Sequence, residues 1–65
     1  MKKLRELRRS TGLTQHELAR LTGMSVGRIA FAETKRLTLT ASEIEKIRLT
    51  LAQRAQEVAA TLAAA

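Results

Sequence analysis

The chain has 65 residues and lacks Cys, Pro, Trp, Tyr, Asp and Asn, so it has room for one small domain and cannot form disulfides. With one His and no Cys or Asp it offers no known metal-ligand spacing, and we expect neither a metal nor another cofactor. The net charge of +6 comes entirely from residues 1–36, where nine Lys or Arg stand against three Glu, and such a basic half favours a polyanionic partner.

Neither export nor membrane insertion is expected. Charged residues at positions 5, 6, 8 and 9 occupy the place where a signal peptide needs its apolar segment. No apolar run approaches the ~20 residues of a membrane span. We therefore expect a cytoplasmic protein with no membrane contact.

The wealth of Leu, Ala, Arg, Glu and Lys predicts an all-α fold, a small domain of four helices joined by short turns over residues 1–65. The first helix is predicted over residues 2–10, with Leu4 and Leu7 facing inward. Gly12 is expected to end this helix in the left-handed conformation, which glycine adopts without steric cost.

The second helix is predicted over residues 15–21. Thr14 is its expected N-cap, and Glu17, three residues later, completes a capping box. Thr22 and Gly23 then end the helix.

The third helix is predicted over residues 26–34. Ser25 is its expected N-cap, and Met24 and Ile29 stand at the spacing of a hydrophobic staple. No Glu completes a capping box here, because Arg28 occupies that position.

The fourth helix is predicted over residues 41–63, with Thr40 and Glu43 forming its capping box. Its apolar row is not interrupted by Gly or Pro, which predicts one continuous helix. The row consists of Ile44, Ile47, Leu51, Ala55, Val58 and Leu62. At 1.5 Å per residue this helix is about 35 Å long, so its end is expected to project from a body of this size.

The second and third helices have the spacing of a helix-turn-helix, with Gly23 at the centre of the turn. Leu18, Met24 and Ile29 are its expected core positions. Ala19 has to be small, because the third helix crosses closely over it. These residues are structural, and they position the outer face of the third helix.

From Leu4 to about Leu51 the chain resembles the helix-turn-helix family of phage repressor and Cro proteins, often called the XRE family. The core of the resemblance is the run Leu13-Thr14-Gln15-His16-Glu17-Leu18-Ala19-Arg20-Leu21-Thr22-Gly23-Met24-Ser25, followed by Ile29 and Glu33. The resemblance implies a lambda-repressor-like fold whose third helix enters the major groove of double-stranded DNA. It also implies dimers that bind sites of twofold symmetry.

The resemblance implies roles for particular residues. Arg8 and Glu33 match a family pair that ties the first helix to the third. The expected phosphate contacts are Thr14, Gln15, Lys35 and Arg36, although the last two also fit a solvated turn. The expected base-reading positions are Ser25, Val26, Gly27, Arg28 and Phe31.

The chain also departs from the family pattern. Val26, Gly27 and Phe31 offer no side-chain hydrogen bond, so Arg28 is the strong polar reader, and Arg facing guanine is the commonest specific contact. For Phe31 the sequence leaves open a position facing DNA and, about equally, a position packed in the core or in a dimer contact. Lys35 stands where the family has Gly, and the family's fifth helix is merged with the fourth.

After Arg54 the only charge is Glu57, and residues 58–63 are apolar nearly all round. We therefore expect the segment 52–65 to be a projecting dimerisation helix. The expected interface is formed by Leu51, Ala55, Val58, Ala59 and Leu62. Two copies would then present recognition helices about 34 Å apart. The alternative is an Ala-rich end that frays.

These features predict a transcriptional regulator, a repressor that binds a palindromic operator as a homodimer. The alternative is an interaction protein tethered to DNA, such as the antitoxin of a toxin-antitoxin pair, whose last helix captures a protein partner. No nucleophile with a base and no phosphate loop is present, so an enzyme is not expected.

Overall fold

A computed structural model describes residues 2–64, which form four helices: α1 (Lys2–Ser10), α2 (Gln15–Thr22), α3 (Val26–Glu33) and α4 (Ala41–Ala64). The predicted all-α, four-helix fold is confirmed, and each helix end lies within one residue of its expected position. The merged last helix is confirmed as well, because α4 runs for 24 residues without a break.

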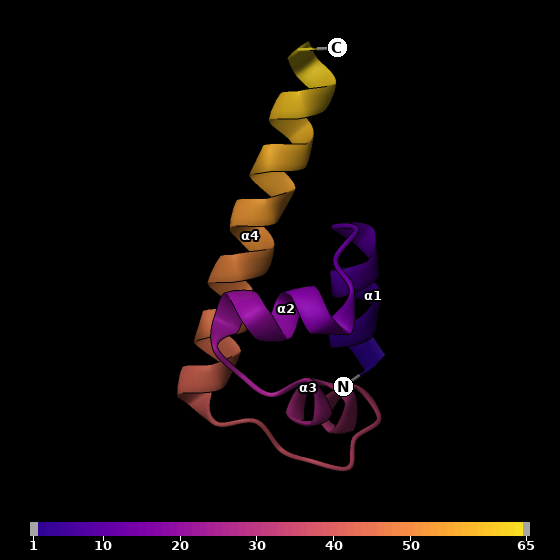
Figure 1. Cartoon of the computed structure of the whole chain (residues 1–65), viewed down its shortest axis with the longest axis vertical. Coiled ribbons are helices and arrows are strands. Elements are labelled where there is room, and N and C mark those ends of the chain that lie inside the picture. The colour runs from indigo at the N-terminus through magenta and orange to yellow at the C-terminus, as the bar shows by residue number, and fades with distance from the viewer. Residues whose placement is uncertain (1, 65) are drawn as a thin grey trace.

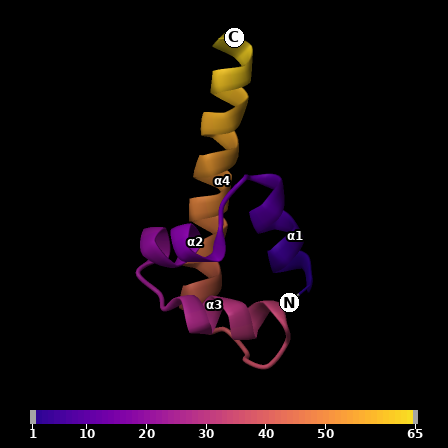
Figure 2. The same cartoon turned by 45° about the vertical axis from the view of Figure 1, so that its right-hand side comes forward.

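The helices form a small body with one long arm (Figure 1). Helix α3 lies crosswise at the end of the molecule opposite the C-terminus, and α2 packs next to it. Helix α4 passes α1 and α2 and then continues alone, as both views show (Figure 2). The Cα positions extend over 40 × 19 × 17 Å, and the far end of α4 stands out from the body (Figure 1).

Hydrogen bonds at the helix starts explain why the sequence fixes these boundaries. Glu17 N donates to Thr14 Oγ1 at 3.1 Å, and Thr14 N donates to Glu17 Oε1 at 3.0 Å. Thr40 and Glu43 form the same reciprocal pair at 2.9 and 3.1 Å. Each capping box satisfies backbone N–H groups that would otherwise lack a helical partner. The hydroxyl of Ser25 caps α3 in the simpler way that its sequence predicts.

Left-handed residues end the first three helices. Gly12 and Gly23 have φ angles of 76° and 72°, as expected, and the third such residue is Lys35 with a φ of 63°. After α3 the N–H of Lys35 donates to Ala32 O at 3.3 Å, and the N–H of Arg36 donates to Phe31 O at 2.8 Å. These two bonds form a Schellman motif. The turn therefore keeps the geometry that suits glycine, although a lysine occupies it.

The core lies between the three short helices and the first half of α4. Leu18 and Ile29 are fully buried, and Ala19 and Ala32 are buried beside them, which allows α2 and α3 to approach closely. The other buried apolar residues are Leu4, Leu13, Leu39, Ile47 and Leu51. The helix-turn-helix spacing read from the sequence thus corresponds to the centre of the core.

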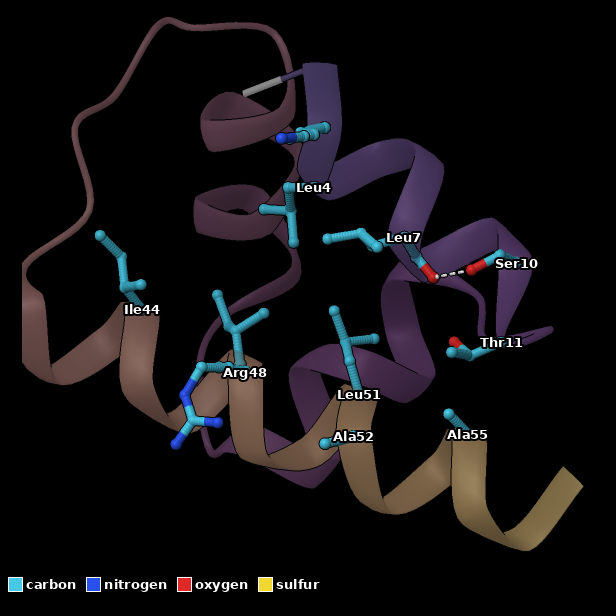
Figure 3. A pocket seen from close by; sticks show the side chains of 11 residues that line it. Leu4, Leu7, Ser10, Thr11, Ile44, Arg48, Leu51, Ala52 and Ala55 are labelled. Atoms are coloured by element: carbon cyan, nitrogen blue, oxygen red, sulfur yellow. Dashed lines mark hydrogen bonds between the residues drawn. The ribbon is translucent and has the colours of Figure 1, made fainter. Parts of the chain in front are cut away.

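One core assignment is wrong, because Leu7 is 53% exposed. Helix α1 packs against α3, and the space between α1 and α4 remains an apolar groove of about 430 Å³. Leu4 and Leu7 line it from α1, and Ile44 and Leu51 line it from α4 (Figure 3). Leu7 and Ile44 therefore lie at the groove surface rather than inside the core.

The left-handed lysine leads to a stability prediction. A side chain in this conformation costs about 1–2 kcal/mol, and glycine avoids that cost while its unfolded chain gains freedom. We expect Lys35→Gly to raise the free energy of unfolding by about 1 kcal/mol, measured by urea denaturation. Arg36→Gly is the control, since it removes the same charge at a position without a positive φ. Equal stabilisation by both variants would contradict the backbone explanation.

Candidate nucleic-acid interface

Helix α3 has one buried face and one exposed face. Ile29, Ala32 and Glu33 are buried, at the spacing of one helical stripe. Gly27 and Phe31, one turn apart, lie on the opposite side and are exposed. The outer face of this helix is therefore open at one end of the molecule (Figure 2).

The two residues that begin α3 have different surroundings. Ser25 is exposed, and its hydroxyl accepts a hydrogen bond from the N–H of Arg28 at 3.1 Å. Val26 is half-buried and packs against the core. Part of the Val26 side chain therefore contacts the core, and only the remaining part is exposed at the outer face of α3.

Arg28, the expected polar reader, is held by the carboxylate of Glu43 at the start of α4. Its Nε donates to Glu43 Oε2, and its Nη2 donates to Glu43 Oε1 at 2.7 Å. The side chain of Arg28 is 36% exposed and that of Glu43 is 17% exposed. Such a bidentate pair has the fork geometry that arginine also uses toward guanine.

Glu43 belongs to two hydrogen-bonding arrangements at once. Its Oε1 accepts from Arg28 and also from the N–H of Thr40 at 2.9 Å. The hydrogen bonds from Arg28 and from the Thr40 backbone lower the pKa of Glu43 from 4.5 to about 2. Donation to the Glu43 carboxylate likewise raises the pKa of Arg28. Both groups are therefore charged at neutral pH.

Phe31 is 52% exposed on the outer face of α3. Of the three positions that the sequence leaves open, the core is excluded within this chain, because Ala32 occupies the buried position instead. An exposed aromatic side chain beside Gly27 is available for contact with another molecule.

A buried polar cluster fixes the position of α3 relative to α1 and the start of α2. Arg8 Nε and Nη2 donate to the two carboxylate oxygens of Glu33 at 2.6 and 3.1 Å. Gln15 Nε2 donates to Glu33 Oε1 at 3.1 Å, and Arg8 Nη1 donates to Leu13 O at 2.9 Å. The expected Arg8–Glu33 pair is thus present, and it includes Gln15 at the start of α2.

Opposing effects act on Glu33. Burial raises the pKa of this carboxyl, but the hydrogen bonds from Arg8 and Gln15 and the positive charge of Arg8 outweigh burial, so the pKa falls below its ordinary value. Glu33 is therefore ionised at neutral pH, and the buried positive charge of Arg8 has its counter-ion. Among residues 2–64 no buried side-chain nitrogen or oxygen lacks a hydrogen-bond partner.

The remaining candidate phosphate contacts lie at the start of α2 and after the end of α3. Lys35 and Arg36 are exposed in the turn that follows α3. Thr14 is exposed before α2, and Gln15 at its first position is half-buried. Thr14 and Gln15 thus lie at the start of α2, Lys35 and Arg36 follow α3, and these two helices pack together.

The candidate dimer residues do not share one environment. Leu51 is 8% exposed and belongs to the core of its own chain. Ala55 and Ala59 are exposed, Val58 is half-buried, and Leu62 is 72% exposed. Among these candidates, those after Leu51 therefore present apolar surface that the described part of the chain leaves open.

Two contacts were missed by sequence reasoning. The hydrogen bond from Gln15 to Glu33 joins residues 18 apart, and the Arg28–Glu43 pair joins residues 15 apart. Glu43 carries a clear signal as a capping residue, but nothing in the chain marks a second role for it. Both contacts depend on how the helices pack.

Two further findings concern other classes of site. Within residues 2–64, no three His, Cys, Asp or Glu side chains come together in a way that would bind a metal ion. None of the helices in the same range combines the length and the hydrophobicity needed to cross a membrane.

A four-helix body with α2, a glycine turn and an exposed α3 defines a helix-turn-helix protein. Residues 4–57 match the helix-turn-helix family, so the chain belongs to the XRE-type helix-turn-helix proteins, which are DNA-binding regulators. The match extends beyond the expected Leu51 into the projecting part of α4. No curated protein and no solved structure matches the chain.

The Arg8–Glu33 pair predicts a strong dependence of stability on one carboxylate. Removing one partner of a buried pair leaves the other charge uncompensated and costs about 3–5 kcal/mol. We expect Glu33→Gln to lose about that much free energy of unfolding at pH 7, measured by urea denaturation. The pKa of Glu33 is lowered on folding. The stabilisation that its charge gives the folded state is therefore present above pH 4.5 and is lost as the pH falls below that value.

The control for this prediction is Glu57→Gln, which neutralises an exposed partner of Arg54. Exposed pairs contribute about 0–1 kcal/mol, so this variant should unfold almost like the unchanged chain. A loss of similar size in both variants would show that Glu33 acts through overall charge and not through its buried contacts.

Proposed function

We propose that this chain is a transcriptional regulator that binds double-stranded DNA sequence-specifically, with α3 in the major groove. The observation that carries the proposal is the open outer face of α3, held at one end of the molecule by the buried Arg8–Glu33–Gln15 cluster. A recognition helix has to be rigid relative to its body so that phosphate contacts set its register.

The proposed phosphate contacts are Thr14, Gln15, Lys35 and Arg36. Lys35 and Arg36 supply positive charge directly after α3, within the basic half of the chain. One N–H of the Gln15 amide is donated to Glu33, and the amide has a second N–H for a phosphate oxygen. The cluster that orients α3 would therefore also orient this contact.

The proposed base contacts come from Ser25, Val26, Gly27, Arg28 and Phe31. Arg28 suits the edge of guanine, whose two acceptors face the major groove. The exposed ring of Phe31 suits a thymine methyl group, and Gly27 beside it allows the backbone to approach the bases.

DNA binding of this kind predicts a steep salt dependence. Each neutralised phosphate releases counterions, so the logarithm of the affinity falls with the logarithm of salt concentration by about 0.9 per phosphate contact. We expect fluorescence anisotropy with a labelled 20-base-pair duplex to show a fall of at least tenfold in affinity between 50 and 200 mM salt. An affinity that hardly changes over this range would contradict the phosphate assignments.

We further propose that two copies associate through the end of α4 and bind a palindromic operator as a repressor. This segment exposes Ala55, Ala59 and Leu62 to solvent, and contiguous apolar surface of this kind favours association. It lies at the opposite end of the molecule from α3 (Figure 1). Ends that pair side by side would leave both α3 helices facing the same way.

A second candidate function rests on the same exposed segment. The end of α4 would suit a different protein as well as a second copy, as in an antitoxin that captures a toxin while bound to DNA. A chain that is a stable dimer when purified alone supports the repressor. A monomer that gains order only with a different protein supports the antitoxin.

Dimerisation through α4 predicts the effect of one charge. We expect Leu62→Glu to convert a dimer to a monomer in analytical ultracentrifugation, because a carboxylate would be buried without a partner. Leu49→Glu is the matched control: Leu49 is 54% exposed on another side of α4 and lies outside the proposed interface. An unchanged mass for Leu62→Glu would remove this segment from the interface.

A further inference from the structure

Glu43 lies where α4 begins and holds the residue best suited to read a base. Its carboxylate accepts from Nε and Nη2 of Arg28, so one edge of the guanidinium is occupied. Among residues 2–64, Arg28 Nη1 donates no hydrogen bond. The other edge of the guanidinium, between Nη1 and Nη2, therefore keeps free N–H groups, and arginine has enough donors to serve both edges.

The carboxylate itself is held in place. Glu43 Oε1 accepts from the N–H of Thr40, and the N–H of Glu43 donates to Thr40 Oγ1 at 3.1 Å. The Glu43 side chain that binds Arg28 is thus also hydrogen-bonded to the backbone at the start of a 24-residue helix. A long, flexible arginine is thereby restricted to one geometry before it meets any ligand.

We propose that Glu43 is a specificity-determining positioning residue, which holds Arg28 so that its free guanidinium edge meets a guanine. This inference rests on the proposed DNA binding through α3. An arginine that is already ordered loses less conformational freedom on binding, so more of its interaction energy contributes to affinity.

The charge of Glu43 adds a second effect. Paired with a carboxylate, Arg28 contributes no net charge and little attraction to phosphates in general. It favours binding only where a base offers acceptors in the right geometry. The pair should therefore weaken binding to unrelated DNA while it maintains binding to the cognate site.

The experiment starts from a duplex that the unchanged chain selects from a random 20-base-pair library. Affinities for this duplex and for a scrambled duplex of equal composition give a discrimination ratio at fixed salt. Glu43→Gln keeps the cap, because Gln also serves in a capping box, and it removes the charge that holds Arg28. We expect the ratio to fall roughly 2- to 10-fold, which matches the ordering of one long side chain.

Glu45→Gln is the matched control. It removes the same charge at a position two residues after Glu43. Glu45 pairs there with Arg48, and the side chains of Glu45 and Arg48 are 55% and 61% exposed. Its ratio should stay within twofold of the unchanged chain. Thermal unfolding of both variants would show whether the cap is intact.

A double-mutant cycle separates positioning from a purely structural role. If Glu43 acts through Arg28, Glu43→Gln should leave the ratio unchanged when Arg28 is already Ala. An unchanged ratio for Glu43→Gln alone would overturn the inference, and so would a higher ratio, since Glu43 would then compete with the bases for Arg28. If Arg28→Ala alone leaves the ratio unchanged, Arg28 is not a reader and the inference also falls.

The proposed function fails in a different way. If the unchanged chain binds no duplex even at 50 mM salt, and the library yields no enriched sequence, sequence-specific DNA binding is overturned and the role of Glu43 with it. Discrimination by the unchanged chain, with no loss in Glu43→Gln, would overturn only the role of Glu43.

Discussion

The buried contact between Arg8 and Glu33 is the constraint on which the rest of the structure depends. It joins α1 to the end of α3, and through Gln15 it also joins the start of α2. The apolar core holds the helices together, but apolar contacts are not directional. The hydrogen bonds of this cluster are directional, so they set the angle at which α3 is presented. The stability of the fold therefore depends on both charged members of the cluster, because a buried charge without its partner is strongly unfavourable.

Much of the fold could be predicted from the sequence, because local hydrogen bonds determine the helix ends. Thr14 with Glu17 and Thr40 with Glu43 act over three residues, and Gly12 and Gly23 meet a steric requirement at a single position. Such signals need no knowledge of how the helices pack. Leu7 was misplaced for the opposite reason: which side of α1 is covered depends on its angle to α4, and periodicity does not contain that angle.

The candidate interface was predictable to a smaller extent. The family resemblance supplies the positions on α3 and the Arg8–Glu33 pair, but the surroundings of each position come from the packed structure. Val26 is partly used by the core, and Arg28 is held by Glu43, which the sequence presents only as a cap. One carboxylate can accept hydrogen bonds from two neighbours at once, as that of Glu43 does from Thr40 and Arg28. The capping-box pattern explains the first contact and gives no sign of the second.

Helix α4 connects the contact with Arg28 at its start to the projecting segment at its far end. Glu43 in its first turn touches Arg28, while its far end stands clear of the body (Figure 1). The helix is about 36 Å long, at 1.5 Å for each of its 24 residues. No Gly or Pro interrupts the helix, so it is a stiff rod. In the proposed dimer, the angle between two such rods at their joined ends would set the distance between the two bodies along the DNA.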